Sequence, residues 1–330
     1  MSNPRVQTET GRKPRHAPPA PGKAVRFTEI VSANPGIDFV GKRRFFLILS
    51  TVLNALALLL VLTWGLNFGV DFAGGTDVRV RFAQPTTAGD VRTALADVDL
   101  PDLIVQDFGA QGTEFLLRFD PTDATAMNAI GATIQQTLAK AQGDGSVQLL
   151  SVESVGPKVG KQLRERGLLA VVCTTIFMGI YIAFRFDLAF GLGAVIALLH
   201  DVLLTTGALV VSQTIFDLTT LAAMLTIIGF SVNDTIIVSD RVRENLRKMR
   251  RSNLADVINL SINETLSRTI LTNGTAILVT LALYLVGGVG LEGFAFTLLV
   301  GFIAGTYSSI FIAAPVVLFW SSRSSLGQTE

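Results

Sequence analysis

The sequence has few charged residues for its length of 330 residues. Charged side chains make up 16% of it and hydrophobic side chains 49%, whereas soluble domains carry about 25% charged residues. This balance indicates a membrane protein. The formal net charge of +1 gives no overall bias toward nucleic acid or acidic partners. We therefore expect no nucleic-acid partner, and any electrostatic signal must lie in how charge is distributed along the chain.

Cysteine and histidine are also scarce. The single cysteine, Cys173, lies within an apolar run, which excludes an intrachain disulfide and indicates a small buried hydrophobe. With only two histidines, His16 and His200, the sequence predicts no metal site. The stretch VGPKVGKQ lacks the glycine spacing and the Ser or Thr of a phosphate-binding loop. We expect neither a cofactor nor an enzymatic active site.

The N-terminal stretch has few large apolar residues. Residues 1–40 begin with a region rich in proline and basic residues, which predicts a disordered leader. The apolar run that follows is longer than the core of a typical signal peptide and has no A-x-A-like cleavage site, so we expect a retained membrane helix. At the other end, residues 321–330 are predicted to form a short tail.

Long hydrophobic runs occur six times. A membrane span needs about 20 mostly apolar residues, and the sequence predicts one span within residues 41–66 and five within residues 166–320. The apolar stretches are 45–65, 168–184, 188–211, 218–238, 269–286 and 294–320. Residues 67–165, between the first span and the second, are predicted to form a domain outside the membrane.

Basic residues are concentrated on one side of these spans. Lys42, Arg43 and Arg44 precede the first span, a second basic cluster lies at 241–251, and the connections after the third and fifth spans contain no Lys or Arg. Short loops rich in Lys and Arg face the cytoplasm. Both termini are therefore expected in the cytoplasm, and residues 67–165 on the outer side.

Residues 67–165 have the pattern of a small α+β domain. Alternating apolar residues predict strands at DVRVRF, DLIVQDF, TEFLLRF and SVQLLSVE. Helical patterns follow the first strand, where Thr87 is a suitable N-cap, and the third strand. The resulting order, βαββαβ, is that of the ferredoxin-like fold.

The segment at about 253–266, before the fifth span, predicts an amphipathic helix along the cytoplasmic membrane surface. Two partners suit its apolar face, the lipid and the helix bundle. The residues at helical spacing are Leu254, Val257, Ile258, Ile262 and Leu266.

Ionisable side chains are rare within the spans, where a charge costs about 2.5–3.5 kcal/mol at the helix centre. Asp234, next to Asn233, lies near the cytoplasmic end of the fourth span, and Arg268 lies at the start of the fifth. Because the chain reverses between these spans, Asp234 and Arg268 lie at similar depth and can form an ion pair. Such a pair serves either proton coupling or helix assembly alone.

His200 and Asp201 lie near the middle of the third span, where reaching either surface is hardest. A histidine beside a carboxylate at this depth suits proton exchange. It equally suits a hydrogen-bond network that fills the bundle with polar groups such as Asn233 and Asn273.

Five motifs resemble those of the SecF proteins of the SecD/SecF family, part of the resistance-nodulation-division superfamily. They cover residues 40–315 approximately. The order of one span, an outer domain and five spans is similar to half of a transporter of that superfamily. The motifs are FGVDFAGGT (68–76), VGPKVG (155–160), LLHDV (198–202), GFSVNDTIIVSDRVREN (229–245) and LSRTILTN (266–273).

The resemblance implies an accessory subunit of protein export in the bacterial inner membrane, with its α+β domain in the periplasm. It implies pairing with SecD, association with the SecYEG channel and other Sec membrane proteins, and contact with a translocating preprotein. In this family, proton flow at the SecD/SecF interface moves the periplasmic domains. The carboxylate and arginine that match Asp234 and Arg268 carry the coupling, and the proton motive force supplies the energy.

Two glycine-containing motifs are also predicted to be hinges between the outer domain and the bundle, because they join the two and contain permissive residue types. Ordinary turn formation is the alternative. The residues concerned are Asp71, Gly74, Gly75, Gly156, Pro157 and Gly160.

Two other functions stay open at this point. One is a half-size drug or lipid exporter of the same superfamily, although such exporters often carry two adjacent aspartates where this chain has Asn233 and Asp234, and need far larger outer domains. The other is a non-conducting scaffold for the translocon, which the charges within the membrane disfavour.

Overall fold

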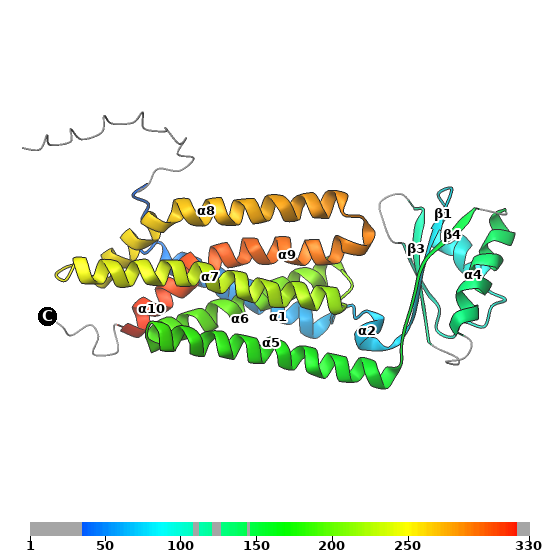
Figure 1. Ribbon diagram of the computed structural model, residues 1–330, viewed down its shortest axis with the longest axis horizontal. Coiled ribbons are helices and arrows are strands. Elements are labelled where there is room, and N and C mark those ends of the chain that lie inside the picture. The colour runs from blue at the N-terminus through cyan, green and yellow to red at the C-terminus, as the bar shows by residue number, and fades with distance from the viewer. Residues whose placement is uncertain (1–34, 108–111, 121–126, 144–145, 322–330) are drawn as a thin grey trace, which may run out of the picture.

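The computed structural model describes residues 35–107, 112–120, 127–143 and 146–321. A bundle of long helices and a small α+β domain lie end to end (Figure 1). We call the end of the bundle next to this domain the domain end, and the opposite end the far end. Most of the predicted leader and all but the first residue of the predicted tail lie outside the described residues.

The described residues contain six helices long and apolar enough to cross a membrane. This confirms the prediction of one span followed, after a small domain, by five more, so the chain is a multi-pass membrane protein. The first five are α1 (Arg43–Thr63), α5 (Pro157–Arg185), α6 (Leu188–Ser212), α7 (Leu218–Lys248) and α8 (Leu254–Val286). The sixth runs through α9 (Val289–Ser308), the π-helix η1 (Ser309–Ala313) and α10 (Ala314–Ser321).

Three of the spans form the centre of the bundle. Buried residues make up 50% of the apolar window in α6 and in α7, and 61% in the sixth span, against 11–22% in α1, α5 and α8. Small residues allow the close contacts: a Cβ on Gly207 of α6 would lie 2.6 Å from the Cβ of Ala57 of α1. Polar side chains on the inward faces of the central helices are therefore shielded from lipid.

The α+β domain has the predicted ferredoxin-like order. Its four antiparallel strands lie in the order β2-β3-β1-β4, and Thr87 caps α3 by accepting a hydrogen bond from the Asp90 N–H at 3.2 Å. A short helix, α2 (Val70–Ala73), precedes the sheet and was not predicted. The elements are β1 (Gly75–Phe82), α3 (Ala88–Ala94), β2 (Ile104–Asp107), β3 (Glu114–Phe119), α4 (Met127–Gln142) and β4 (Val147–Val155).

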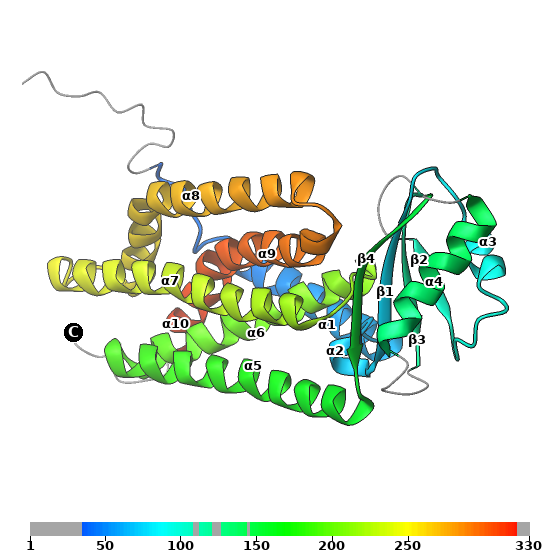
Figure 2. The ribbon, with the colours of Figure 1, turned by 45° about the vertical axis from the view of Figure 1, so that its right-hand side comes forward.

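The sheet stands between its own helices and the bundle. Figure 2 shows α3 and α4 on the side of the sheet away from the bundle. Val78 and Val80 of β1 and Leu117 of β3 point into the core on that side. Because side chains alternate along a strand, Asp77 and Arg118 belong to the opposite face, which is turned toward the domain end.

Residues 253–266 form the first turns of α8 rather than a separate helix. Figure 2 shows these turns crossing the far end before α8 runs along the bundle. Ile258 and Ile262 are buried against Val238 of α7 and Val317 of α10. The bundle, and not lipid, therefore covers this apolar face.

Two asparagines of α8 bind the backbone just before α1. Asn263 exchanges two hydrogen bonds of 2.8 Å with the N–H and carbonyl oxygen of Ile37. Asn259 Oδ1 accepts from the N–H of Phe39 at 2.8 Å and of Val40 at 3.1 Å. Residues 35–40, the end of the predicted disordered leader, are therefore ordered, because side-chain amides satisfy a backbone that has no secondary structure of its own.

Candidate functional site

Asp234 is a carboxylate buried where three spans meet, with 1% of its surface exposed. Its Oδ2 accepts a hydrogen bond from Nδ2 of Asn273 on α8. The same nitrogen donates to Oγ1 of Thr306 on α9 at 2.6 Å. Asn273 of α8 therefore contacts both α7 and α9.

Two buried acceptor atoms at this junction have no hydrogen-bond partner within the described part of the chain, Asp234 Oδ1 and Asn273 Oδ1. Leaving a buried polar atom unpaired costs roughly 1–3 kcal/mol. A proton on Asp234 Oδ1 would turn this acceptor into a donor and so remove one of the two unpaired acceptors. The junction is thus suited to a carboxyl group that gains and loses a proton.

Arg268 does not form the ion pair with Asp234 that its position allowed. Arg268 is exposed, and no N···O contact within 4.0 Å joins the two side chains. Arg268 precedes Asn273 by five residues, which turns it about 140° around α8 from the face that meets Asp234. It nevertheless stays within electrostatic reach of the carboxylate.

Asn233 does not belong to this buried junction or to the network around His200. It lies exposed on α7, in line with Ala222, Thr226 and Gly229, which are exposed as well. A Cβ added to Gly229 would meet nothing within 4 Å. One face of α7 therefore presents small and polar side chains, the residue types that pack transmembrane helices against each other.

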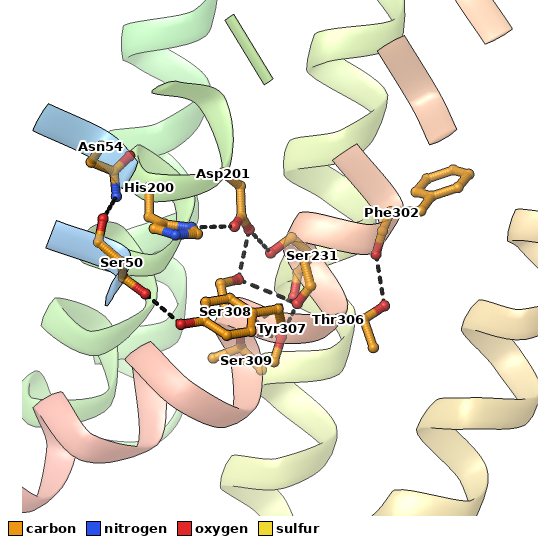
Figure 3. A network of polar contacts seen from close by, with 12 residues as sticks. Ser50, Asn54, His200, Asp201, Ser231, Phe302, Thr306, Tyr307, Ser308 and Ser309 are labelled. Carbon is orange, nitrogen blue, oxygen red and sulfur yellow. Dashed lines mark hydrogen bonds and ion pairs between the residues drawn. The ribbon is translucent and has the colours of Figure 1, made fainter. Parts of the chain in front are cut away.

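His200 and Asp201 of α6 form the centre of a second polar cluster, shown in Figure 3. His200 Nδ1 lies 3.0 Å from Asp201 Oδ1. Asp201 Oδ2 accepts hydrogen bonds from Ser231 Oγ of α7 at 2.6 Å and Ser308 Oγ of α9 at 2.8 Å. His200 and Asp201 therefore lie in a polar network that is formed with serines in place of the asparagines we expected. Whether the pair exchanges protons or only fills the bundle stays a prediction.

Tyr307 of α9 extends this cluster to α1. Its ring stacks on that of His200, with centroids 5.8 Å apart, and its hydroxyl forms a hydrogen bond of 2.7 Å with Ser50 Oγ (Figure 3). The same hydroxyl donates to the Phe46 carbonyl oxygen at 3.0 Å. Within the described residues, His200 Nε2 has no hydrogen-bond partner. The cluster thus ties α1, α6, α7 and α9 together and leaves one ring nitrogen open.

The predicted hinge motifs pack against each other. Pro157 is the first residue of α5 and Gly156 its N-cap, so the second motif starts a helix instead of forming a loop. A Cβ on Gly74 would lie 2.8 Å from Pro157 Cα, and one on Gly160 would lie 2.9 Å from the Gly74 nitrogen. Gly75 has a φ of +115°. Close backbone contact explains Gly74 and Gly160, and the positive φ explains Gly75. The role of the two motifs as hinges stays a prediction.

The residues that sequence reasoning did not assign are the hydroxyls and amide around the two carboxylates. Ser231, Thr306, Tyr307 and Ser308 are polar residues within apolar stretches, and that position is a usable signal. Asn273 was noted only as a neighbour for His200. Which polar residue meets which carboxylate depends on the rotation of each helix, and hydropathy does not report that rotation.

Comparison with known proteins gives two family matches. Residues 133–323 match the protein export membrane protein SecD/SecF, C-terminal, and residues 61–86 match the SecD/SecF GG motif. The first match alone covers more than half of the sequence. The chain belongs to the SecD/SecF family. The second match includes Gly74, which follows α2 directly, and Gly75, the first residue of β1.

Curated relatives are SecF proteins. The chain is 45% identical over 293 residues to protein translocase subunit SecF of Desulfurispirillum indicum, covering 87% of this chain and 92% of the relative. It is 47% identical over 283 residues to that of Magnetococcus marinus, with 85% and 91% covered. These similarities place the chain among the SecF translocase subunits of the Sec machinery.

Solved SecDF structures share the fold. SecDF of Thermus thermophilus, described as a translocon-associated membrane protein, matches with a TM-score of 0.80 and 34% identity over 89% of this chain and 40% of that chain. SecDF in a Super-membrane-facing form matches with the same identity and coverage but a TM-score of 0.66. The chain therefore spans 40% of these SecDF chains, and its TM-score is lower with the Super-membrane-facing form.

Proposed function

We propose that the chain is a proton-coupled subunit that acts with SecD and SecYEG to promote translocation and release of preproteins. It uses the proton motive force at the bacterial inner membrane, without a cofactor and without enzymatic catalysis. Both termini lie in the cytoplasm and the α+β domain in the periplasm. The observation that carries the proposal is Asp234, a buried carboxylate that accepts a hydrogen bond from Asn273 through Oδ2. Within the described residues, its Oδ1 and the Asn273 amide oxygen have no hydrogen-bond partner.

Protonation of Asp234 changes its contact with α8. In the protonated form, the carboxyl group both donates to and accepts from the Asn273 amide. In the ionised form, Asp234 Oδ1 and Asn273 Oδ1 are both acceptors without a donor in the described structure, so the amide must turn or a cation must approach. Arg268, exposed about one and a half turns along α8, stabilises the ionised form when α8 rotates. Gain and loss of a proton thus switch α7 and α8 between two arrangements.

The available energy is sufficient for such a switch. One proton crossing 100 mV releases about 2.3 kcal/mol, and each unit of pH gradient adds about 1.36 kcal/mol. Since 1.4 kcal/mol corresponds to a factor of about 10 in an equilibrium, the potential alone shifts a two-state equilibrium by roughly 40-fold. The lower TM-score with SecDF in a Super-membrane-facing form supports more than one arrangement of this region.

His200 and Asp201 support the coupling by holding α7 in place. Ser231, which donates to Asp201, lies one turn from Asp234 on the same helix. The cluster binds α7 to α6 and α9 and leaves the α7–α8 contact free to change. We therefore assign these residues to positioning rather than to the proton route.

The small polar face of α7 suits a transmembrane helix of SecD. A side-chain amide such as that of Asn233 finds no partner in lipid, and the open space at Gly229 admits a close helix. The solved relatives are named SecDF and extend well beyond the part that matches this chain. The basic residues at 241–251, at the far end, agree with a cytoplasmic location for that end. No contact described above favours an exporter or a scaffold.

The experiment that tests the proposal is replacement of Asp234 by Asn in a reconstituted SecD/SecF system. We expect proton conductance and late-stage translocation to fall to background, because the amide cannot ionise. Asp240→Asn is the matched control, since Asp240 is an exposed acid on the same helix. Unchanged conductance and translocation in Asp234→Asn would remove the assignment.

Copurification separates the remaining alternatives. A SecD-like protein and channel subunits should accompany the chain. A homotrimer without them would support the exporter, and a complex with channel subunits but no proton conductance would support the scaffold.

A further inference from the structure

The connection between α6 and α7 is bound to the segment that leads into the sheet. The Phe216 N–H donates to the Asn67 carbonyl oxygen at 2.7 Å, and the Gly69 N–H donates to the Phe216 carbonyl oxygen at 2.8 Å. The N–H of Leu218, the first residue of α7, donates to Asp71 Oδ2 at 3.0 Å. The domain end of α7 is thus attached directly to residues 67–72.

Three aromatic rings pack around these hydrogen bonds. The rings of Phe72 and Phe216 stack with centroids 5.4 Å apart, and Phe68 lies edge-on to both at 6.2 and 6.0 Å. The guanidinium of Arg164 on α5 lies 5.7 Å from the centre of the Phe68 ring. Phe68 is therefore held by the bundle from α5 and from the α6–α7 connection.

Arg118 of β3 links this attachment to the sheet. Its Nη1 donates to the Phe68 carbonyl oxygen at 2.9 Å, while Nε and Nη2 donate to the two carboxylate oxygens of Asp77 on β1 at 2.9 and 3.1 Å. The side chains of Arg118 and Asp77 are only 17% and 8% exposed. A forked, shielded pair of this kind fixes geometry as well as charge.

A second ion pair on the same two strands lacks this link. Arg81 of β1 and Glu114 of β3 lie opposite each other, as Asp77 and Arg118 do, and their closest contact is 2.7 Å. The Arg81 side chain is 51% exposed. No hydrogen bond joins either residue to the bundle in the described structure. The two pairs differ mainly in the bond to Phe68 and in burial.

We propose that Arg118 is a positioning residue that fixes the orientation of the α+β domain on the bundle. Through Asp77 it holds the two central strands, and through Phe68 it holds the backbone attached to α7. Movement of α7 then reaches the sheet through bonded contacts. This proposal rests on the proposed function only for its effect on translocation, since the orientation can be measured independently.

The orientation is measured by double electron–electron resonance (DEER) between two spin labels on the full chain in lipid nanodiscs. Cys173 is first replaced by Ala, and cysteines are introduced at Gln136 on α4 and Val286 at the domain end of α8, both exposed. We expect one narrow distance distribution in the parent. Arg118→Gln should broaden or shift it, and Arg81→Gln should leave it unchanged. An unchanged distribution in Arg118→Gln overturns the proposal.

A second variant keeps the test decisive if Arg118→Gln does not fold. Asp71→Ala leaves the sheet intact and removes the bond to the first residue of α7, so it should shift the same distance. Arg118→Lys keeps the charge opposite Asp77 but cannot reach both partners, and should give an intermediate distribution. If Asp71→Ala and Arg118→Lys both fold and both keep the parent distance, the proposed role of Arg118 is contradicted.

Activity separates this proposal from the proposed function. With SecD present, Arg118→Gln should retain proton conductance and lose most translocation, because Asp234 is untouched. If the substitution merely destabilised the domain, its unfolding temperature would fall and its orientation would stay unchanged. If Asp234→Asn leaves conductance unchanged, the proposed function fails, and the spin-label distance still decides the role of Arg118.

Discussion

Gly160 of α5 lies against the backbone at Gly74, so close that a Cβ on Gly160 would fall 2.9 Å from the Gly74 nitrogen and 3.3 Å from the Phe72 carbonyl oxygen. The contact joins the two glycine motifs. We predict that Gly160→Ala lowers the free energy of unfolding by about 1–3 kcal/mol, because backbone atoms cannot yield as a flexible side chain can. Thermal unfolding in detergent measures the loss.

The same motif supplies a control. Gly156 has a φ of −65°, and a Cβ there would meet nothing within 4 Å. Gly156→Ala should therefore unfold at the parent temperature. If both substitutions cost the same, flexibility of the motif rather than close packing would explain its glycines.

Asn273→Ala should destabilise the protein by about 1–3 kcal/mol, because it leaves the buried Asp234 carboxylate without its donor. The cost should be smaller in an Asp234→Ala background, where no carboxylate is left to satisfy. Unfolding of both single variants and the double variant measures this coupling. Thr275→Ala, at an exposed site on α8, is the control. Equal costs in both backgrounds would refute the coupling.

His200→Asn should assemble with SecD and conduct protons as the parent does. The asparagine amide can donate to Asp201 from about the position of Nδ1, so the network survives without a titratable ring. Assembly is checked by copurification and conductance in proteoliposomes. Normal assembly with lost conductance would make His200 a proton relay and reverse our assignment.

The double substitution Asn259→Ala and Asn263→Ala should release the segment before α1. Hydrogen exchange at the amides of Ile37, Phe39 and Val40 should accelerate, since each now donates to one of these asparagines. Mass spectrometry of the corresponding peptide measures it. Thr275→Ala again serves as the control, and parent-like exchange in the double variant would show that other contacts suffice.

Periodicity predicted the parts of the fold that depend on local pattern. Apolar runs located the six spans, and alternation located the strands of a sheet whose order the structure confirms. The start of α5 at Pro157 was missed. Pro157 and the charged residues after it belong to the helix but lie outside the apolar window. Hydropathy detects the apolar part of a helix and not its polar extension.

The sequence predicted the two carboxylates of the site but not their hydrogen-bond partners. The cost of a charge in an apolar run singled out Asp234 and Asp201. The pairing of Asp234 with Asn273 rather than Arg268 follows from the rotation of α8, and the pairing of Asp201 with Ser231 and Ser308 from the packing of α7 and α9 on α6. Such rotations are set by tertiary contacts among many residues.

Helix α7 is continuous from Leu218 to Lys248 and can tilt as a rigid rod. Asp201 holds it at Ser231, so a tilt would pivot about that residue. Asp234 lies three residues to one side, about 4.5 Å along the axis, and Leu218, bonded to Asp71, lies thirteen residues to the other, about 20 Å away. Under the proposed function, a tilt of α7 about Ser231 that moves the helix by about 0.5 Å at Asp234 would move Leu218, at the domain end, by about 2 Å. Protonation of Asp234 would then be amplified roughly fourfold in displacement at the segment that leads into the sheet.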